Sequence, residues 1–461
     1  MLLLVQSLET SHQLSLINNL LLFRGKPRNL GSVTWGVRDR RRGKEVFMTV
    51  EERINEANGK VMDMFLNGRP VWTDVRPAIE VVPGMKKNLI LHPGPPIDKE
   101  HIVFPLKNSI SGAAVHEGLA KNVDEAWNMV LSGEIEIAPA QEYSCGCAAA
   151  MVMSASMPVI VVEDKYSGGK GFSTPHPGPK PKVLRWGLYD EEVEEDLKAF
   201  EKDYCPYLGE AVRKSGGIDI ISILSKTAGM GDENHNRQPA GSMCLALTLA
   251  PYLLDIDAPK KAIKDFLAND RFFLNPVMAS ALSIIASAKK VKCSTVMTAM
   301  CGNGEEFGIQ VAGTGNKWYT TEAPYIEGTL LKPTYKKSDM LRYMGDSCVT
   351  EVYGFGGMTA IAGPMYMKLT GSSFEEALSR TEKARKVSLG EHTFAPVPWN
   401  DYKGMPVGVD VRKVVGYNVL PISHGGSGLK TGGQAGAGAA ELPMECFKKA
   451  LVGVAEDMGI I

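Results

Sequence analysis

The sequence predicts a multidomain protein that joins an α/β half to an antiparallel α+β half. Between residues 60 and 165, short β-branched runs alternate with helical segments, as in a Rossmann-like domain. A largely helical stretch follows, and from Ser294 onward apolar runs are separated by turns such as Asn303-Gly304. We therefore expect a Rossmann-like domain at 48–182, a mainly helical domain at 183–293 and an α+β domain with Gly-rich loops at 294–461, preceded by an extension at 1–47.

Composition excludes several classes of protein. The formal net charge of the 461 residues is −1, which lacks the clustered basic excess of a nucleic-acid-binding protein. No stretch of about 20 apolar residues exists to span a membrane. Cys145 and Cys147 are the only close pair among the eight cysteines, and no second pair stands at zinc spacing. We expect free thiols in a reducing, cytoplasmic compartment and no metal.

The first 47 residues differ from the rest of the chain. They begin with an apolar run that lacks the charged start of a signal peptide. Arg40-Arg-Arg-Gly-Lys-Glu45 stands just before Met48, and purine-rich codons for that run would resemble a bacterial ribosome-binding site. We expect Met48 to be the native start and residues 1–47 to be translated upstream sequence.

In the α/β half, Asn88–Leu91 is a short apolar strand that ends in a Pro/Gly loop containing His92. Such a loop is either a ligand site or a rigid turn. Pro158–Val162 is a continuous β-branched run, which favours a buried parallel strand. No Gly-x-Gly-x-x-Gly sequence occurs in this half, so we expect no dinucleotide and no other cofactor.

The helical middle contains the densest polar cluster of the chain, Met230–Arg237, just before an apolar helix at 243–254. It carries two carboxylates, an imidazole, two amides and a guanidinium. Free amides at a helix start attract anions, so the cluster is either a binding loop or a solvated loop with an N-cap. Further along, Asn275-Pro276 predicts a helix start with Asn275 as N-cap.

In the C-terminal half, 295–300 and 307–311 predict an antiparallel hairpin, and Ser373-Phe-Glu-Glu376 predicts a capping box. Gly425–Gly438 predicts a glycine-rich loop, which is either an anion nest or a mobile surface loop. It is not a Walker A motif, because Leu429 stands where glycine is required before Lys430. Asp346 and Glu351 lie among small and apolar residues, where a carboxylate must be paired, protonated or bound.

Several motifs taken together resemble the YahG/YlbE-like family. They are Met230-Gly-Asp-Glu-Asn-His-Asn-Arg237, Phe272-Phe-Leu-Asn275, Thr298-Ala-Met300 with Asn303-Gly304 and Phe307-Gly-Ile309, Met344-Gly-Asp-Ser347 with Thr350-Glu351 and Gly354-Phe-Gly-Gly357, Gly408–Val415, and Gln434-Ala-Gly-Ala-Gly438. The resemblance covers Thr49 to Ile461. The assigned members are the large G-type subunit of oxamate carbamoyltransferase, from anaerobic allantoin and purine degradation.

The resemblance implies an enzyme subunit that converts oxalurate and phosphate to oxamate and carbamoyl phosphate. Its implied partners are an F-type subunit resembling succinyl-CoA synthetase and a small H-type subunit. Two alternatives remain open: a transferase acting on another ureide or amide, and a noncatalytic scaffold in which Asp232, His235 and Arg237 form a subunit interface. The Ser-Thr-Arg-Thr phosphate motif of the aspartate and ornithine enzymes is absent.

Phosphorolysis of a ureide needs an anion clamp, oxyanion donors and a general acid. His235 is the expected acid, Asp232 orients either His235 or a cation, and Arg237 clamps a carboxylate or a phosphate. Asn303 and Asn275 are the expected oxyanion donors, with further amides from the glycine loops. The full candidate set has a catalytic and a substrate-binding part. The catalytic candidates are His235, Asp232, Glu233 and Asn303, and the substrate or phosphate-binding candidates are Arg237, Asn275, Asp346, Glu351, Gly356, Gly357, Gly436 and Gly438.

Overall fold

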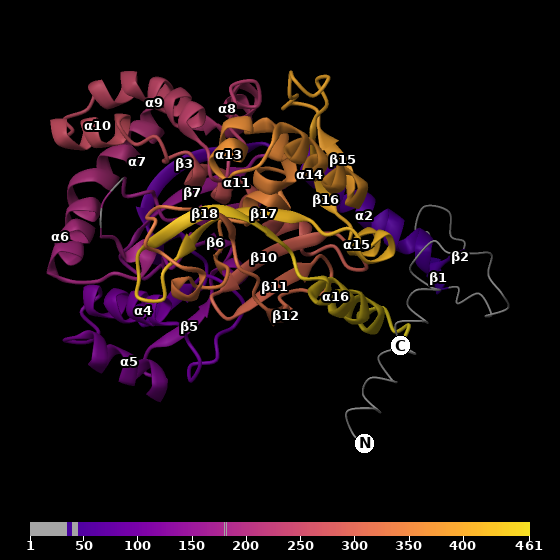
Figure 1. Cartoon of the computed structure of the whole chain (residues 1–461), viewed down its shortest axis with the longest axis horizontal. Coiled ribbons are helices and arrows are strands. Elements are labelled where there is room, and N and C mark those ends of the chain that lie inside the picture. The colour runs from indigo at the N-terminus through magenta and orange to yellow at the C-terminus, as the bar shows by residue number, and fades with distance from the viewer. Residues whose placement is uncertain (1–34, 39–44, 179, 181) are drawn as a thin grey trace.

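The structure is a computed structural model that describes residues 35–38, 45–178, 180 and 182–461. The predicted upstream extension therefore lies mostly outside the described residues. In the part of the chain that is described, no helix is both long enough and apolar enough to cross a membrane. Figure 1 shows α6, α7, α9 and α10 of the middle region on the left of the molecule and the C-terminal helix α16 toward its right side.

The N-terminal half is organised on a largely antiparallel sheet with the strand order β6-β8-β7-β3-β9. Its strands are β3 (Pro70–Pro77), β6 (Cys145–Gly146), β7 (Pro158–Asp164), β8 (Lys170–Ser173) and β9 (Ile218–Asp219). The predicted parallel strand at Pro158–Val162 is wrong, because β7 pairs antiparallel with both β3 and β8. Alternate side chains of β7 enter two different hydrophobic cores, so the strand is buried on both faces. A strand buried in this way is apolar throughout, whether its neighbours run parallel or antiparallel to it.

In the described part of the chain, parallel pairing joins β4 (Leu89–His92) to β5 (Glu136–Pro139), and the two-residue β6 to β8. The helices α4 (Phe104–His116) and α5 (Val123–Ser132) connect β4 to β5. The predicted Rossmann-like domain is thus not confirmed, because the short β4–β5 pair stands beside a mainly antiparallel sheet.

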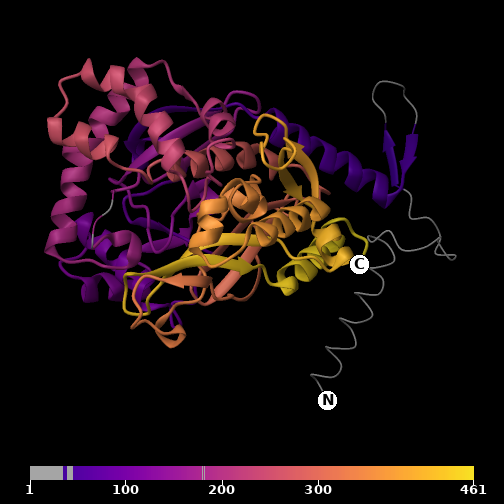
Figure 2. The same cartoon turned by 45° about the horizontal axis from the view of Figure 1, so that its top comes forward.

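The predicted helical middle is confirmed. Its helices are α6 (Glu191–Ala199), the π-helix η3 (Phe200–Tyr204), α7 (Cys205–Lys214), α8 (Ile220–Thr227), α9 (Pro239–Leu254), α10 (Lys260–Leu267) and α11 (Leu274–Ala288). Figures 1 and 2 place α6, α9 and α10 at the outer end of the molecule and α11 in its interior. Asn275 is not the N-cap of α11, because the helix begins at Leu274 and the Asn275 amide donates to the Thr174 carbonyl instead.

The C-terminal half contains the predicted antiparallel hairpin, formed by β10 (Met297–Asn303) and β11 (Glu306–Val311). Its sheet has the order β12-β11-β10-β14, where β12 is Tyr319–Glu322 and β14 is Met344–Gly345. The short helix α12 (Val349–Val352) and the 3-10 segment η5 (Gly356–Ala362) follow. The capping box at Ser373 begins α14 (Phe374–Val387), as predicted.

The predicted loop at Gly425–Gly438 is instead a pair of antiparallel strands, β17 (Ile422–Gly428) and β18 (Gln434–Glu441). β18 also pairs with β13 (Glu327–Leu330). A Cβ on Gly436 or Gly438 would collide with the β13 backbone, so the glycines serve close strand packing. Glycine is depleted in ordinary strands, which is why composition favours a loop here.

The remaining elements complete the C-terminal half and the N-terminal edge. They are β1 (Trp35–Arg38), β2 (Glu45–Met48), α2 (Val50–Asn67), α3 (Ala78–Val81), η1 (Ala140–Tyr143), η2 (Leu184–Trp186), η4 (Lys337–Asp339), α13 (Pro364–Leu369), β15 (Ser388–His392), β16 (Met405–Val409), α15 (Val411–Tyr417) and α16 (Met444–Asp457). One hydrophobic core contains Phe65, Phe272 and Phe447, and therefore includes residues of all three predicted domains. The domain boundaries themselves stay predictions.

Candidate functional site

The polar cluster at Met230–Arg237 lies between α8 and α9 and folds into the interior. Asp232, Glu233, Asn234 and His235 are each no more than 1% exposed. The prediction of a solvated loop is therefore wrong for these four residues. Four adjacent polar side chains remain buried only when other groups satisfy them, so their partners define the site.

His235 and Glu351 form a buried pair. The Nδ1 atom of His235 donates to Oε1 of Glu351 at 2.7 Å, and both side chains are 1% exposed. Glu351 comes from α12 and also accepts the backbone N–H groups of Gly357 and His424, both at 2.9 Å. With Nδ1 engaged, Nε2 is the ring nitrogen that can meet a ligand.

The electrostatics favour a protonated His235. Burial alone lowers its pKa, but the charge and hydrogen bond of Glu351 and the charge of Glu233 raise the pKa above its usual value. The positive charge of Arg185 acts in the opposite direction. His235 is therefore suited to hold a proton near neutral pH and to deliver it to a bound substrate.

A second imidazole–carboxylate pair supports the first. Oε2 of Glu233 accepts from Nδ1 of His424 at 3.2 Å, and Oε1 accepts the N–H groups of Asn236 and Arg237 at 2.6 Å. Burial alone raises the pKa of Glu233, but His424 and the other donors lower it below its usual value. Glu233 thus fixes the loop that carries His235 rather than facing a ligand.

Gly356 and Gly357 connect the His235–Glu351 pair to the Glu233–His424 pair through backbone hydrogen bonds. The N–H of Gly356 donates to the carbonyl of Glu233 at 2.7 Å, and its φ is +61°. A Cβ at this position would meet the Glu351 carboxylate and would approach the Cβ of His235 to 2.8 Å. Glycine is required here because the backbone passes directly beside the pair.

Asp232 and Arg237 lie at the other side of the loop. Oδ2 of Asp232 accepts the Gly241 N–H at 2.8 Å, whereas Oδ1 is 3.8 Å from Nε of Arg237. Burial raises the pKa of Asp232 to about 7, although Gly241 and Arg237 both lower it. Asp232 makes no hydrogen bond with His235 in the described residues, so Glu351, not Asp232, orients the imidazole.

Asp346 directly follows β14 and is fully buried. Its carboxylate accepts from the Gln141 amide at 3.0 Å and from the N–H groups of Gly94 and Cys147 at 3.2 and 3.1 Å. Burial raises its pKa to about 6 in spite of these donors. Asp346 ties three segments together, and the next residue, Ser347, lines the cavity described below.

His235 lines a polar cavity of about 110 Å³. Its lining comes from the 176–186 segment, the His235 loop, the α11 start, the β14 region and the strand β17. The polar and charged lining residues are His176, Lys180, Arg185, Trp186, His235, Asn236, Gln238, Arg271, Tyr343, Ser347 and Gln434. Aspartate and glutamate are absent from the described residues of this lining, so the cavity is suited to an anion.

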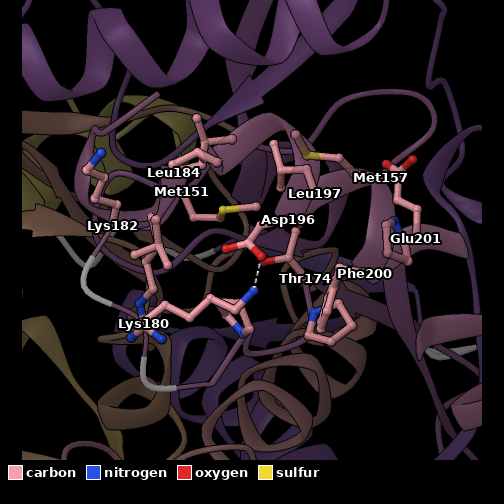
Figure 3. Close-up of a pocket in the computed structure, with 16 residues that line it drawn as sticks. Met151, Met157, Thr174, Lys180, Lys182, Leu184, Asp196, Leu197, Phe200 and Glu201 are labelled. Atoms are coloured by element: carbon pink, nitrogen blue, oxygen red, sulfur yellow. Dashed lines mark ion pairs between the residues drawn. The ribbon is translucent and has the colours of Figure 1, made fainter. Parts of the chain in front are cut away.

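A second cavity of about 50 Å³ adjoins the first and shares Lys180 and Arg185 with it. Figure 3 shows this cavity, where methionine, leucine and phenylalanine side chains surround the ion pair between Lys180 and Asp196 at 2.5 Å. It is small and mostly apolar, and it does not include His235. We therefore assign the candidate site to the polar cavity.

Of the twelve predicted site residues, His235 is the one that lines the polar cavity in the described part of the chain. Four of the other eleven have roles apart from the His235 loop and its partners. The Asn303 side chain accepts the N–H groups of Glu305 and Glu306 and so forms the turn after β10. Asn275 donates to Thr174, while Gly436 and Gly438 pack against β13. The Gly438 carbonyl also accepts from the Tyr366 hydroxyl, which in turn accepts from Asn236.

Sequence reasoning missed Arg185, Arg271 and His176, which the fold brings to the cavity from η2, from the residues before α11 and from the 174–178 segment. Arg185 stands between Leu184 and Trp186, and a lone arginine between apolar residues was the available signal. Among the described residues, no group of three or more His, Cys, Asp or Glu side chains is arranged to hold a metal ion.

The fold and the cavity define a mixed α/β protein with a polar cavity beside a buried histidine–glutamate pair. The chain belongs to the family of YahG and the AllG subunit of oxamate carbamoyltransferase. It is similar to the uncharacterized protein YahG of Escherichia coli K12, with 34% identity over 89% of this chain and 88% of that protein. It is also 32% identical to the oxamate carbamoyltransferase subunit AllG of the same organism, over 88% of this chain and 99% of that one.

Two other comparisons agree with this assignment. Residues 135–347 match the family model described as oxamate carbamoyltransferase subunit AllG. The crystal structure of a conserved protein of unknown function from Enterococcus faecalis V583 superposes with a TM-score of 0.85 at 34% identity, covering 88% of this chain and 99% of that one. The fold described above is thus also found in a crystallised relative.

Proposed function

We propose that this chain is the large subunit of an oxamate carbamoyltransferase and that its polar cavity binds oxalurate and phosphate. One observation carries the proposal: His235, backed by Glu351, faces a cavity whose charged lining residues are all cationic. Both substrates are anions, so a cavity without carboxylates suits them. The family name of the AllG relative supplies the reaction.

The reaction needs a proton at the leaving nitrogen. An oxygen of hydrogen phosphate attacks the carbamoyl carbon of oxalurate, the bond between that carbon and the oxamate nitrogen breaks, and the nitrogen gains a proton. His235 gives that proton through Nε2 and recovers one from the phosphate, so the sum of the reaction is balanced. Glu351 holds the imidazole in place and favours its charged form.

Neutral donors of the cavity have a second role in this proposal. Negative charge develops on the carbamoyl oxygen during attack and must be stabilised by hydrogen-bond donors. Asn236, Gln238 and Ser347 line the cavity and can donate without adding charge. The predicted oxyanion donors Asn275 and Asn303 are not among the described residues that line the cavity, so these three residues replace them in the proposal.

The proposal includes partner subunits of the F type and the H type, as the family resemblance implies. A purely structural subunit would have no need of a cationic cavity beside a histidine–glutamate pair. The burial of Asp232 and His235, each at 1% exposure, also leaves little of their surface for an interface. Both observations favour a site within this chain over a noncatalytic scaffold.

The test is co-purification with the products of the neighbouring genes, followed by an assay of oxalurate phosphorolysis. Formation of carbamoyl phosphate and oxamate supports the proposal. Other ureides and amides in the same assay address the alternative substrates. An assembled complex that forms no carbamoyl phosphate from oxalurate overturns it.

A further inference from the structure

We propose that Arg185 and Arg271 form a dianion site that binds the inorganic phosphate co-substrate. The inference deepens the proposed function and rests on it for the identity of the ligand. Arginine suits this role, because its planar guanidinium keeps its charge and can give two parallel hydrogen bonds to one phosphate.

The two arginines lie close enough to repel each other. Burial, together with the positive charge of Arg271, lowers the pKa of Arg185 to about 10, which still leaves it charged at neutral pH. No ion pair with a carboxylate is found for either side chain among the described residues, and the described cavity lining contains no Asp or Glu. Burying the Arg185 charge beside a second cation and without a counter-charge is costly unless an anion joins them.

Arg185 has unused hydrogen-bonding capacity. Its Nε and Nη1 atoms are buried and have no hydrogen-bond partner among the described residues. Buried donors of this kind are rare in folded proteins and mark places where a ligand or water completes the bonding. Lys180 differs from Arg185, because its charge is already paired with Asp196.

His176 adds an uncharged donor on the same wall. Its Nδ1 accepts the N–H of Gly178 at 3.0 Å, so the ring proton is on Nε2. Burial and the charges of Arg185 and Arg271 hold the pKa of His176 well below its usual range. A neutral imidazole beside two guanidinium groups completes a set of donors around one anion.

Binding of inorganic phosphate to the full chain, measured by calorimetry, tests this inference. Arg185→Gln and Arg271→Gln are each expected to weaken binding at least about tenfold, because each removes charged hydrogen bonds. Arg213→Gln is the control. Arg213 of α7 pairs with Asp74 of β3 and is not among the cavity-lining residues, so its loss should leave phosphate binding unchanged.

Arg271 is exposed, so its variant is expected to fold even if loss of the more buried Arg185 affects folding. Phosphate binding to folded Arg271→Gln and Arg185→Gln at the parent affinity overturns the site, and so does the absence of phosphate binding to the parent chain. Arg185→Lys keeps the charge but loses the two-pronged geometry, and should bind with intermediate affinity.

The outcomes separate this inference from the proposed function. If phosphate binds through the arginines but the assembled complex does not cleave oxalurate, the dianion site stands and the proposed reaction fails. If the complex cleaves oxalurate while the KM for phosphate is unchanged in both variants, the reaction stands and the dianion site fails.

Discussion

His235 donates through Nδ1 to Oε1 of Glu351 at 2.7 Å, across 116 residues of sequence. The loop before α9 supplies the imidazole and α12 supplies the carboxylate. The contact fixes the ring and sets the proton on Nδ1 whenever the imidazole is neutral. The predictions for the proposed general acid follow from this one contact.

Replacing the imidazole is the first test. We expect His235→Asn to lower kcat for oxalurate phosphorolysis by about 10²–10⁴-fold, the usual contribution of a positioned general acid. The asparagine amide can still donate to Glu351, so the buried carboxylate keeps a partner and the protein folds. Exposed His101, paired with Asp98, provides the control variant His101→Gln. Parent-like kcat in His235→Asn would remove His235 from the chemistry.

Replacing the carboxylate should change the pH profile. Glu351 raises the pKa of His235, so Glu351→Gln is expected to lower that pKa. A general acid works only while protonated, and the alkaline limb of kcat should therefore move to lower pH. The glutamine oxygen can still accept from Gly357 and His424, which preserves the fold. A purely structural Glu351 would leave the alkaline limb in place, measured between about pH 5 and pH 9.

Parts of the site could be read from the sequence, because they are local. Asp232, Glu233 and His235 are crowded into one segment, and their chemistry stands out without a fold. The pairing of His235 with Glu351 could not be read in this way, since it depends on how α12 packs against the loop. Arg185 and Arg271 are single arginines in separate segments, and only tertiary structure makes them neighbours.

Strand direction and strand pairing also depend on contacts between residues far apart in the sequence. Hydrophobic periodicity located β7 and the β10–β11 hairpin, but periodicity cannot give the direction of a strand buried on both faces. The many glycines at Gly425–Gly438 predict a loop, but in the structure they allow β18 to pack closely against β13. The direction of β7 and the strand structure at Gly425–Gly438 are both set by pairing with strands that are distant in the sequence.

Gly356 offers a test of the backbone beside the pair. We expect Gly356→Ala to lower the free energy of unfolding by about 1–3 kcal/mol and to reduce kcat, because its Cβ would press on Glu351 and His235. Gly371 also has a positive φ, of +79°, but nothing lies within 4 Å of its Cβ position. Gly371→Ala therefore measures the backbone cost alone. Equal losses of stability and activity in the two variants would contradict the packing argument.

His116 predicts how stability depends on pH. Burial alone lowers its pKa, but hydrogen bonds and charges from Glu201 and Glu194 raise it to about 9. A raised pKa means that the folded state holds the proton more tightly than the unfolded state. This contribution is therefore complete below the unfolded pKa of 6.5 and is lost as the pH rises through about 9.

We expect the unfolding free energy of the parent to fall by about 1–3 kcal/mol from this group between those two pH values. In His116→Gln this part of the decline should be absent, while stability near pH 6 should be lower than in the parent. Denaturant unfolding at a series of pH values measures both. Parallel pH curves for the parent and the variant would show that His116 does not carry this dependence.

Substitution of Arg237 tests whether this residue binds an anion, as the sequence predicts, or stabilises the fold. It lies beside Asp232 and is not among the residues that line the polar cavity. Asp232 is buried, so removing the nearby positive charge should raise the pKa of Asp232 further. The folded protein should then be less stable at pH values above about 7, where this carboxylate is charged. For Arg237→Ala we expect a loss of about 1–2 kcal/mol at pH 8 that shrinks as the pH falls toward 4, where Asp232 is protonated in the folded protein.

Arg237→Lys keeps the positive charge and should recover most of that stability. Phosphate affinity of Arg237→Ala should stay within about threefold of the parent, because a lost charged hydrogen bond to the ligand would cost more than that. A large loss of phosphate affinity together with unchanged stability would instead favour the clamp predicted from the sequence. The comparison with Arg185→Gln then decides which arginine holds the anion, since only one of the two variants should leave phosphate binding intact.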